Sequence, residues 1–437
     1  MLRRLFPNVY EGWIVVGSSA TVVLIIGAAL FYGLSLFFNE LIAEIGLSVA
    51  MTSIAFSLRS ELNGIAAPFI GIGIDRYGPR AVTFFAVTVC SVGVLLLSMV
   101  QNSWQFFGVM VILAIGSSGG GGQTGLAAIA TWFERRRSLA MSFSTLGGGV
   151  AGVLVVGIAW LIEVFGWRPA LQILAGCMLV FGFGFGMQIR SRPVGHPQPM
   201  DGRETLDATG TPLGAALRWG IPLRQAVRTR AFLLSALAVV LLSFSTTAIS
   251  VHLVPYVERE FEVSKRVAGS TIALYTLMSI VGRLGLGTLG DRYPKRMVIA
   301  CCGLLIGSGT LLLALATNFP MVLVAIALVA PGFGGIVPVR PAMMADYFGT
   351  KHFGTINVIA AAMNTTGGAI GPSVVGYLVD LTGAYLAGWY VCVAVSFLAM
   401  PVALLAPPPH ELVERYRREA EDEREADRAA PPRLASE

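Results

Sequence analysis

Long runs of apolar residues, separated by short polar segments, extend along almost the whole chain. About a dozen runs reach roughly 20 residues, the length that an α-helix needs to cross a hydrocarbon layer of about 30 Å. A β-barrel is excluded because its strands would alternate apolar and polar residues over segments of about ten. The pattern predicts an all-α membrane protein whose twelve transmembrane helices lie at residues 13–34, 51–72, 80–100, 105–131, 138–162, 168–189, 230–256, 266–289, 296–316, 321–345, 353–379 and 385–405.

The composition agrees with a membrane protein. Of the 437 residues, 55% are hydrophobic and 13% are charged, against about 25% charged in soluble domains. Most of the 31 Lys and Arg residues lie in the segments that would face one side, so the positive-inside rule predicts that both termini are cytoplasmic. We therefore interpret the net charge of +6 as topology. We expect a multi-pass protein of the cell's inner (plasma) membrane, without a nucleic-acid partner.

Two halves of the chain repeat each other. The segment GIGIDRYGPR at 71–80 is echoed by GTLGDRYPKR at 287–296, so Asp75 and Asp291 lie 216 residues apart. Two similar six-helix units in the same orientation predict pseudo-symmetric bundles around a central site. We expect bundles at 1–189 and 230–405, a cytoplasmic linker at 190–229 and a cytoplasmic tail at 406–437.

At these loops the chain resembles the major facilitator superfamily. The pattern G-x-x-x-D-R-x-G-x-R occurs here with Gly71, Asp75, Arg76, Gly78 and Arg80, and a degenerate copy carries Asp291, Arg292 and Arg296. The resemblance covers nearly the whole chain and implies the twelve-helix major facilitator fold. Because two aspartates recur at repeat-related positions, we assign gating to Gly71, Asp75, Arg76, Gly78, Arg80, Asp291 and Arg292.

Within this superfamily the chain is most similar to the group of monocarboxylate transporters and oxalate/formate antiporters. The segment Trp132–Ala140, WFERRRSLA, is close to the group's signature Y-F-x-K/R-R-x-x-L-A, and Glu11-Gly12-Trp13 partly matches its first-helix signature. Arg283 falls on helix eight, where the group places its substrate-carboxylate arginine. Two departures are Ser279, where many animal carriers have an acid, and the absence of a lysine from helix eleven.

Arg283 is the first candidate for substrate binding. It lies eight residues before Asp291, about 12 Å along the helix and close to the bilayer midplane. A cation at this depth costs at least about 2.5 kcal/mol, so it must face water, an acid or a substrate. It would receive a substrate carboxylate, or else form a structural ion pair. Arg340, placed at a similar depth, either makes a second anion contact or pairs with Asp346.

Glycine and proline interrupt helices four and ten at matching positions, at 117–125 and 331–340. Such breaks indicate a central binding site, although glycines also serve close helix packing. Further hydrogen bonds to a substrate are expected from Tyr32, Gln123, Tyr275 and Asn364. Scattered tyrosines of this kind also act as packing residues.

Two residues are candidates for proton coupling. Glu61 is an acid deep within helix two, where low dielectric favours its neutral form, and the alternative is a salt bridge or an outer gate. His252 lies near the outer end of helix seven and could titrate or act as a helix cap.

The sequence thus predicts a secondary active transporter of a small organic anion, a monocarboxylate, by alternating access with proton symport or anion exchange. The alternatives are an exporter of amphipathic drugs or metabolites, or a transport-inactive sensor. Without a G-x-x-x-x-G-K-[ST] motif, an ATP-driven pump is disfavoured. We expect no enzyme activity, cofactor or metal, and a protein that works as a monomer in the lipid bilayer with its anion and a proton or exchanged anion.

Overall fold

The computed structural model describes residues 10–37, 40–41, 49–120, 122–193, 219–263 and 265–429, together with Glu44 and Asp201. Nearly all of this chain is helical. Ten helical stretches are long and apolar enough to span a membrane. In this set of ten, the two legs of the bent helix Val49–Leu97 are counted as one stretch, and the helix Arg137–Phe165 is not included. With these two adjustments the described helices match the twelve expected from the sequence.

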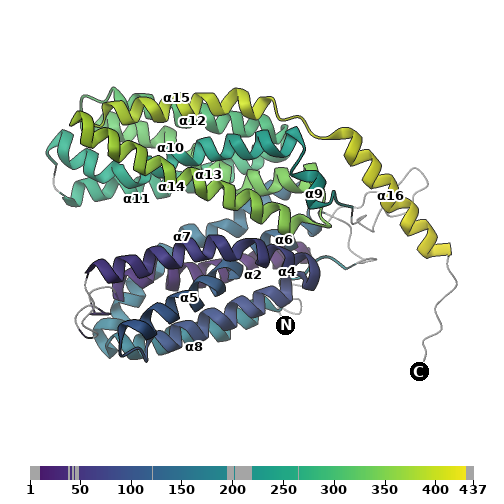
Figure 1. Ribbon diagram of the computed structural model, residues 1–437, viewed down its shortest axis with the longest axis horizontal. Helices are drawn as coiled ribbons and strands as arrows, with labels where there is room; N and C mark the ends of the chain where they lie inside the picture. Colours follow the sequence, from purple (N-terminus) through teal and green to yellow (C-terminus); the bar gives the residue numbers. More distant parts are fainter. Residues whose placement is uncertain are drawn as a thin grey trace.

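The first half of the chain forms one bundle, drawn in purple and blue in Figure 1. Its helices are α2 (Glu11–Ile26), continued by η1 (Gly27–Tyr32) and η2 (Gly33–Phe37), then α4 (Val49–Leu97), α5 (Ser103–Gly120), α6 (Gln123–Trp132), α7 (Arg137–Phe165) and α8 (Trp167–Gly186).

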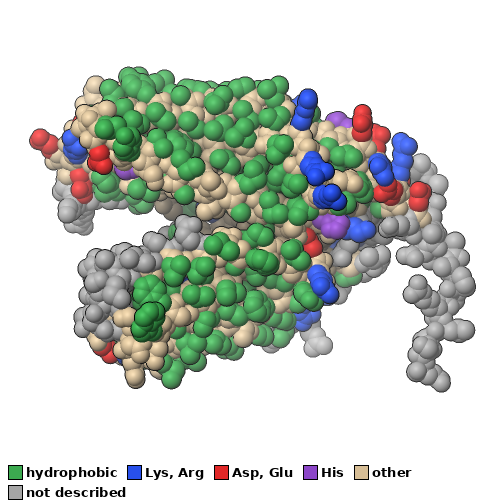
Figure 2. Space-filling model, in the orientation of Figure 1, with side chains coloured by type: hydrophobic (Ala, Val, Ile, Leu, Met, Phe, Trp, Pro, Cys, Tyr) green, Lys and Arg blue, Asp and Glu red, His purple; other side chains and the backbone are tan. Residues whose placement is uncertain are grey.

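The second half forms the other bundle, drawn in teal, green and yellow. It contains α10 (Arg230–Phe261), α11 (Lys265–Arg292), α12 (Lys295–Ala314), α13 (Phe319–Phe348), α14 (Phe353–Thr382) and α15 (Leu386–Leu404). The short α9 (Leu223–Ala226) and the tail helix α16 (His410–Ala429) lie at the end of the molecule that carries both termini. We call this the terminal end. Figure 2 shows hydrophobic side chains along the flanks of both bundles and charged ones at their ends, as a bilayer requires.

Helix α4 turns back on itself at Gly78. This residue has φ 83° and ψ 160°, a conformation that favours glycine, and Pro79 starts the second leg. A Cβ atom added at Gly73 would lie 3.5 Å from Val82, so the two legs pack side by side. The motif glycine therefore joins the expected second and third helices.

The two predicted interruptions have different outcomes. Helix four is broken: Gly122 has φ 94° and separates α5 from α6. Helix ten is not, because α13 runs unbroken from Phe319 to Phe348 through three internal prolines, and the prediction was wrong there. In α13 the small residues serve close packing instead, since a Cβ atom added at Gly334 would lie 2.0 Å from the Ser279 carbonyl oxygen of α11.

Replacing Gly334 with valine is expected to destabilise the protein strongly. The new side chain would meet backbone atoms of Ser279, which have no flexible end that can move aside, and overpacking typically costs about 1–3 kcal/mol. Thermal unfolding of the purified protein should show a melting temperature lower by several degrees. Gly285→Ala is the control, because a Cβ atom there meets nothing within 4 Å. Equal melting temperatures for wild type and Gly334→Val would contradict the packing.

At the end opposite the termini, Glu44, which lies in the chain between η2 and α4, contacts α8. Its carboxylate accepts hydrogen bonds from Trp167 Nε1 and from Arg168 Nε, the latter at 3.0 Å. These hydrogen bonds, led by that from Trp167, hold the pKa of Glu44 below its usual value.

The pH dependence of this contact follows from the direction of the pKa shift. The stabilisation is present above the ordinary glutamate pKa of about 4.3 and is lost as the pH falls through the lower pKa of the folded protein. Glu44→Gln should therefore melt below wild type at neutral pH, and the two curves should converge at the acid end. A constant gap over the whole pH range would refute this prediction.

Candidate functional site

Arg283 lies where the two bundles meet, about two-thirds of the way along α11. Its Nη1 donates a hydrogen bond to the Thr145 carbonyl oxygen of α7 at 2.6 Å. In return, the Ser142 hydroxyl of α7 donates to the Arg283 carbonyl oxygen at 2.6 Å. The arginine is partly exposed, and Gly149 leaves room beside its guanidinium. A cation of the second half is thus held against the backbone of the first.

Tyr275 and Phe333 form an aromatic pair in the same bundle as Arg283. Their rings stack with centroids 5.6 Å apart at an angle of 28°. Tyr275 is 5% exposed, and its hydroxyl has no hydrogen-bond partner among the described residues. A buried hydroxyl in this condition has its hydrogen-bonding capacity available for a ligand or water.

Gln123 and Asn357 connect the bundles through α6 and α14. The Asn357 amide donates to Gln123 Oε1 at 2.7 Å. Gln123 reaches across because it directly follows the break at Gly122. Asn364 is partly exposed and lies seven residues after Asn357, on the same face of α14. Of the amide candidates, Gln123 thus contacts the opposite half, while Asn364 lies on the face that turns toward it.

Arg340 lies at a different level from Arg283, so the sequence estimate of a similar depth was wrong. A Cβ atom added at Gly334 would lie 3.0 Å from the backbone nitrogen of Arg283, whereas one added at Gly290 would lie 3.2 Å from the Val339 side chain. Arg340 is therefore level with Asp291 rather than with Arg283. Parallel packing of α11 and α13 fixes this offset, which counting from the helix ends does not show.

The alternative pairing of Arg340 with Asp346 is also absent from the described part of the chain. Asp346 instead accepts hydrogen bonds from Arg137 of the first half and from Lys295 of the second. The Arg340 Nη1 atom is buried and has no hydrogen-bond partner among the described residues.

The two motif aspartates bind the opposite halves at the terminal end. Asp75 accepts hydrogen bonds from the Gly354 and Thr355 amides at 2.7 and 2.8 Å and from the Thr355 hydroxyl at 2.6 Å. Asp291 accepts from the Ser138 and Leu139 amides at 2.7 and 3.0 Å. Each carboxylate thus caps the N-terminus of a helix in the other bundle, α14 or α7, where the helix dipole favours an anion.

The other motif residues have separate places. Gly71 lets α4 approach α14, because a Cβ atom there would lie 2.9 Å from Thr355 Cα. Arg76 and Arg80 are exposed and lie over the rings of Tyr77 and Phe84. Gly78 makes the turn in α4, and Arg292 is exposed at the end of α11. Arg76, Gly78, Arg80 and Arg292 are therefore predicted gating residues for which the structure describes no contact between the halves.

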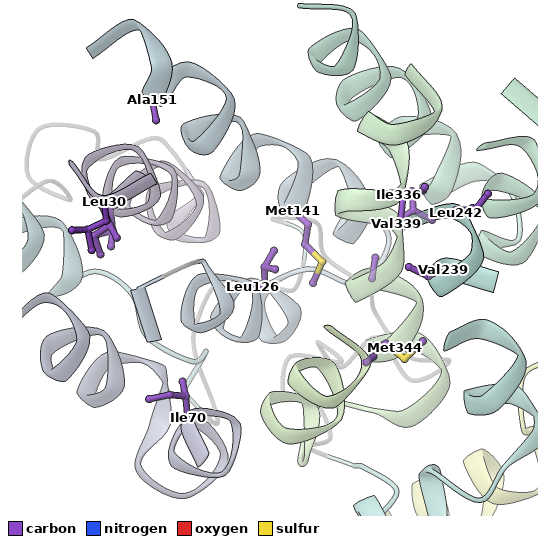
Figure 3. Close-up of a cluster of buried hydrophobic side chains, with 14 of the residues drawn as sticks. Leu30, Ile70, Leu126, Met141, Ala151, Val239, Leu242, Ile336, Val339 and Met344 are labelled. Atoms are coloured by element: carbon purple, nitrogen blue, oxygen red, sulfur yellow. The ribbon is translucent and has the colours of Figure 1, made fainter. Parts of the chain in front are cut away.

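An apolar layer continues the contact between the halves. Figure 3 places Met141 of α7 and Leu126 of α6 opposite Ile336 and Val339 of α13, and all four side chains are buried. Together with the two aspartates, this layer closes the terminal end. In Figure 2 the halves separate toward the opposite end, so the groove between them opens there.

His252 lies away from this interface. Its Nε2 contacts the Pro372 carbonyl oxygen at 2.9 Å, and its ring meets the edge of Tyr385. Both partners belong to the second half, so the described contacts of His252 hold α10 against α14. The side chains of Tyr32 and Glu61 lie outside the described part of the structure.

The two signature segments pack against each other at the terminal end of the first half. Trp13 meets the edge of Phe133 at 5.0 Å, and the Tyr10 hydroxyl donates to the Trp132 carbonyl oxygen at 2.8 Å. Glu11 forms an ion pair with Arg190 at 2.5 Å. These residues thus build a structural cluster rather than part of the central site.

Sequence reasoning did not name the partners of the aspartates or of Arg283. The repeat contains a signal for the former, because the shift of 216 residues that relates Asp75 to Asp291 also relates Ser138 to Gly354. No comparable signal marks Thr145, whose backbone carbonyl makes the contact. A backbone acceptor is available at almost every position, so only the packing of α7 on α11 selects it.

The chain matches the family model of the Major Facilitator Superfamily over residues 20–258 and 235–434. The protein belongs to the Major Facilitator Superfamily. It is similar to monocarboxylate transporter 13 of Bos taurus, with 26% identity over 417 residues that cover 92% of this chain and 91% of the relative. Monocarboxylate transporter 12 of Rattus norvegicus is 24% identical over 415 residues, covering 88% and 83%. The superfamily member described here is thus a multi-pass membrane transporter related to monocarboxylate transporters.

Solved structures agree on the fold. The E. coli fucose:proton symporter superposes with a TM-score of 0.67 at 16% identity, covering 90% of this chain and 98% of the symporter. A bacterial homologue of the iron transporter ferroportin, in an outward-facing state, gives 0.66 at 16% identity, covering 90% and 98%. At this identity the likeness shows the twelve-helix fold of the superfamily.

Proposed function

We propose that this protein is a secondary active transporter of a small organic anion, a monocarboxylate, that works by alternating access. The observation that carries the proposal is Arg283, a partly exposed arginine at the meeting point of the two bundles, about two-thirds of the way along α11. A guanidinium presents its donors in a planar fork that matches a carboxylate. Similarity to monocarboxylate transporters over nearly the whole chain supports the same substrate class.

The bound carboxylate would compete with a contact between the halves. Arg283 Nη1 donates to the Thr145 carbonyl oxygen, and a substrate that takes this donor weakens the link. It also neutralises the cation, so the halves can move without carrying a bare charge through low dielectric. Substrate binding is thereby coupled to the relative motion of the bundles.

The closed terminal end supplies the second part of the proposal. The Lys and Arg distribution supports a cytoplasmic location for this end, and with that orientation the groove at the opposite end would face outward. Asp75 and Asp291 are the latches of this state, because each holds a helix N-terminus of the other half. To open inward, both carboxylates must release those amides.

Proton symport and anion exchange are the two coupling modes. Glu61 and His252 are the candidate proton carriers. His252 Nε2 contacts a carbonyl oxygen, which only accepts, so this contact favours the tautomer with the hydrogen on Nε2. Exchange would require neither residue, because a second anion neutralises Arg283 on the return step.

The test begins with purified protein and a panel of pyruvate, lactate, formate, oxalate, succinate and the hydrophobic cation tetraphenylphosphonium. A carboxylate that raises the melting temperature is then followed as a radiolabel into proteoliposomes. Uptake driven by an inward proton gradient indicates symport, and uptake that needs internal carboxylate indicates exchange. Response to the cation alone, with none to any carboxylate, would refute the anion proposal and favour an exporter of amphipathic compounds.

A further inference from the structure

Arg340 is a buried cation for which the described residues provide no anion. Its Nη1 atom is inaccessible and lacks a hydrogen-bond partner among them. Two nearby carboxylates are already engaged: Asp291, at the level of Arg340, by the α7 amides, and Asp346, six residues further along α13, by Arg137 and Lys295. A buried charge in this condition is costly unless water or an external anion solvates it.

The position of Arg340 on α13 turns it toward the protein interior. Val324, on the same helix, is 55% exposed on the outer flank of the bundle. Arg340 follows it by 16 residues, which rotates the side chain about 160° around the helix axis, to the opposite face. Phe333, seven residues before Arg340, shares this inner face and stacks on Tyr275. Phe333, Val337 and Arg340 are each partly accessible, whereas most of their neighbours on α13 are buried.

The level of Arg340 lies between Arg283 and the closed terminal end. It follows Gly334, the residue beside Arg283, by six residues, or about 9 Å along α13. Helical side chains lean toward the N-terminus of their helix, so its guanidinium reaches from the level of Asp291 back toward Arg283. The close packing of Gly290 against Ser138 and Val339 is at the same level as Arg340.

From this arrangement we propose that Arg340 is a second anion site, which receives the substrate carboxylate after Arg283 and before release. The inference rests on the proposed function of Arg283. While the terminal end is closed, the Nη1 atom of Arg340 is inaccessible and has no hydrogen-bond partner among the described residues. When Asp291 releases α7, the same guanidinium lies on the route from Arg283 to the cytoplasm. The carboxylate then passes from one cation to the next instead of crossing the apolar layer alone.

The inference separates binding from translocation. In Arg340→Gln and Arg340→Met, the melting-temperature response to a carboxylate such as pyruvate should keep its half-saturating concentration within about twofold of wild type. Uptake of radiolabelled pyruvate into proteoliposomes should fall at least about tenfold. Methionine provides a second neutral variant of similar length, suited to a buried site, should glutamine fail to fold. Arg340→Lys should retain part of the uptake, and Arg230→Gln, an exposed arginine at the terminal end, should match wild type.

A further readout distinguishes this role from a structural one. Removing an unpaired buried charge should leave the ligand-free melting temperature of Arg340→Met equal to or above that of wild type. A lower melting temperature in both neutral variants would overturn the inference, because it would mean that Arg340 has a stabilising partner.

The transport results also separate the second anion site at Arg340 from the proposed function. Wild-type uptake in the neutral variants would overturn the second anion site, and so would a loss of carboxylate binding equal to that in Arg283→Gln. If Arg283→Gln is inactive in those same experiments, the proposed function still stands. A wild type that responds to none of the carboxylates would overturn both.

Discussion

Replacing Arg283 with glutamine is expected to abolish carboxylate uptake while the protein still folds. Glutamine keeps a hydrogen-bond donor for the Thr145 carbonyl oxygen but has no charge and no planar fork. Hydrogen bonds to a charged group contribute about 1.5–3 kcal/mol each, so loss of a two-pronged contact should lower uptake at least about 100-fold. Initial rates of radiolabelled carboxylate uptake into proteoliposomes measure this directly.

Two further variants make the result specific. Arg283→Lys keeps the charge without the fork, so it should bind more weakly than wild type but better than the glutamine variant. Arg135→Gln removes an exposed arginine from the terminal end and should transport normally. Melting temperatures confirm that each variant is folded. Undiminished uptake by Arg283→Gln would leave the arginine a structural role and remove the argument for an anionic substrate.

Neutralising Asp75 and Asp291 together is expected to open the terminal end. Each carboxylate caps a helix of the opposite half with at least two backbone hydrogen bonds. Replacing such a cap with alanine costs about 0.5–2 kcal/mol. The two aspartates act at equivalent places in the repeat, so we expect similar shifts for the single variants and a larger one for Asp75→Ala/Asp291→Ala. Transport should fall as the state that is closed at the terminal end loses population.

Spin-label distances across the terminal end measure this shift. Labels at Arg135→Cys and Tyr293→Cys would report on the two halves, because both side chains are exposed. The exposed native cysteines, Cys177 and Cys301, are first changed to serine. The distance should lengthen in the double variant and stay unchanged in Glu134→Gln, which neutralises an exposed acid nearby. An unchanged distance in the double variant would show that the aspartates do not hold this state.

Most of the fold could be predicted from local patterns in the sequence. The apolar runs predicted helix positions to within a few residues for α7 and α14, expected at 138–162 and 353–379 and observed at Arg137–Phe165 and Phe353–Thr382. The repeat also identified Asp75 and Asp291 as a related pair. Such features depend on residues close together in the chain, which fix apolar length, backbone conformation and helix ends.

Contacts between distant helices account for the errors. The Gly/Pro segment of α13 looks like that of helix four, yet only helix four breaks, since the glycines of α13 are used to pack on α11. Asp346 lies six residues from Arg340 but pairs with Arg137 and Lys295. Composition does not distinguish these outcomes, because a glycine serves a break and a close contact equally well.

The sequence alone thus determined a twelve-helix membrane protein of two related halves, with an arginine inside the eighth helix and a motif aspartate in each half. The tertiary structure decided what these groups contact: the Thr145 carbonyl for Arg283, the α14 and α7 amides for the aspartates, and a level nearer the termini for Arg340. The reason is physical. Helix formation depends on neighbours along the chain, whereas the offset and spacing of packed helices depend on side chains from both halves at once.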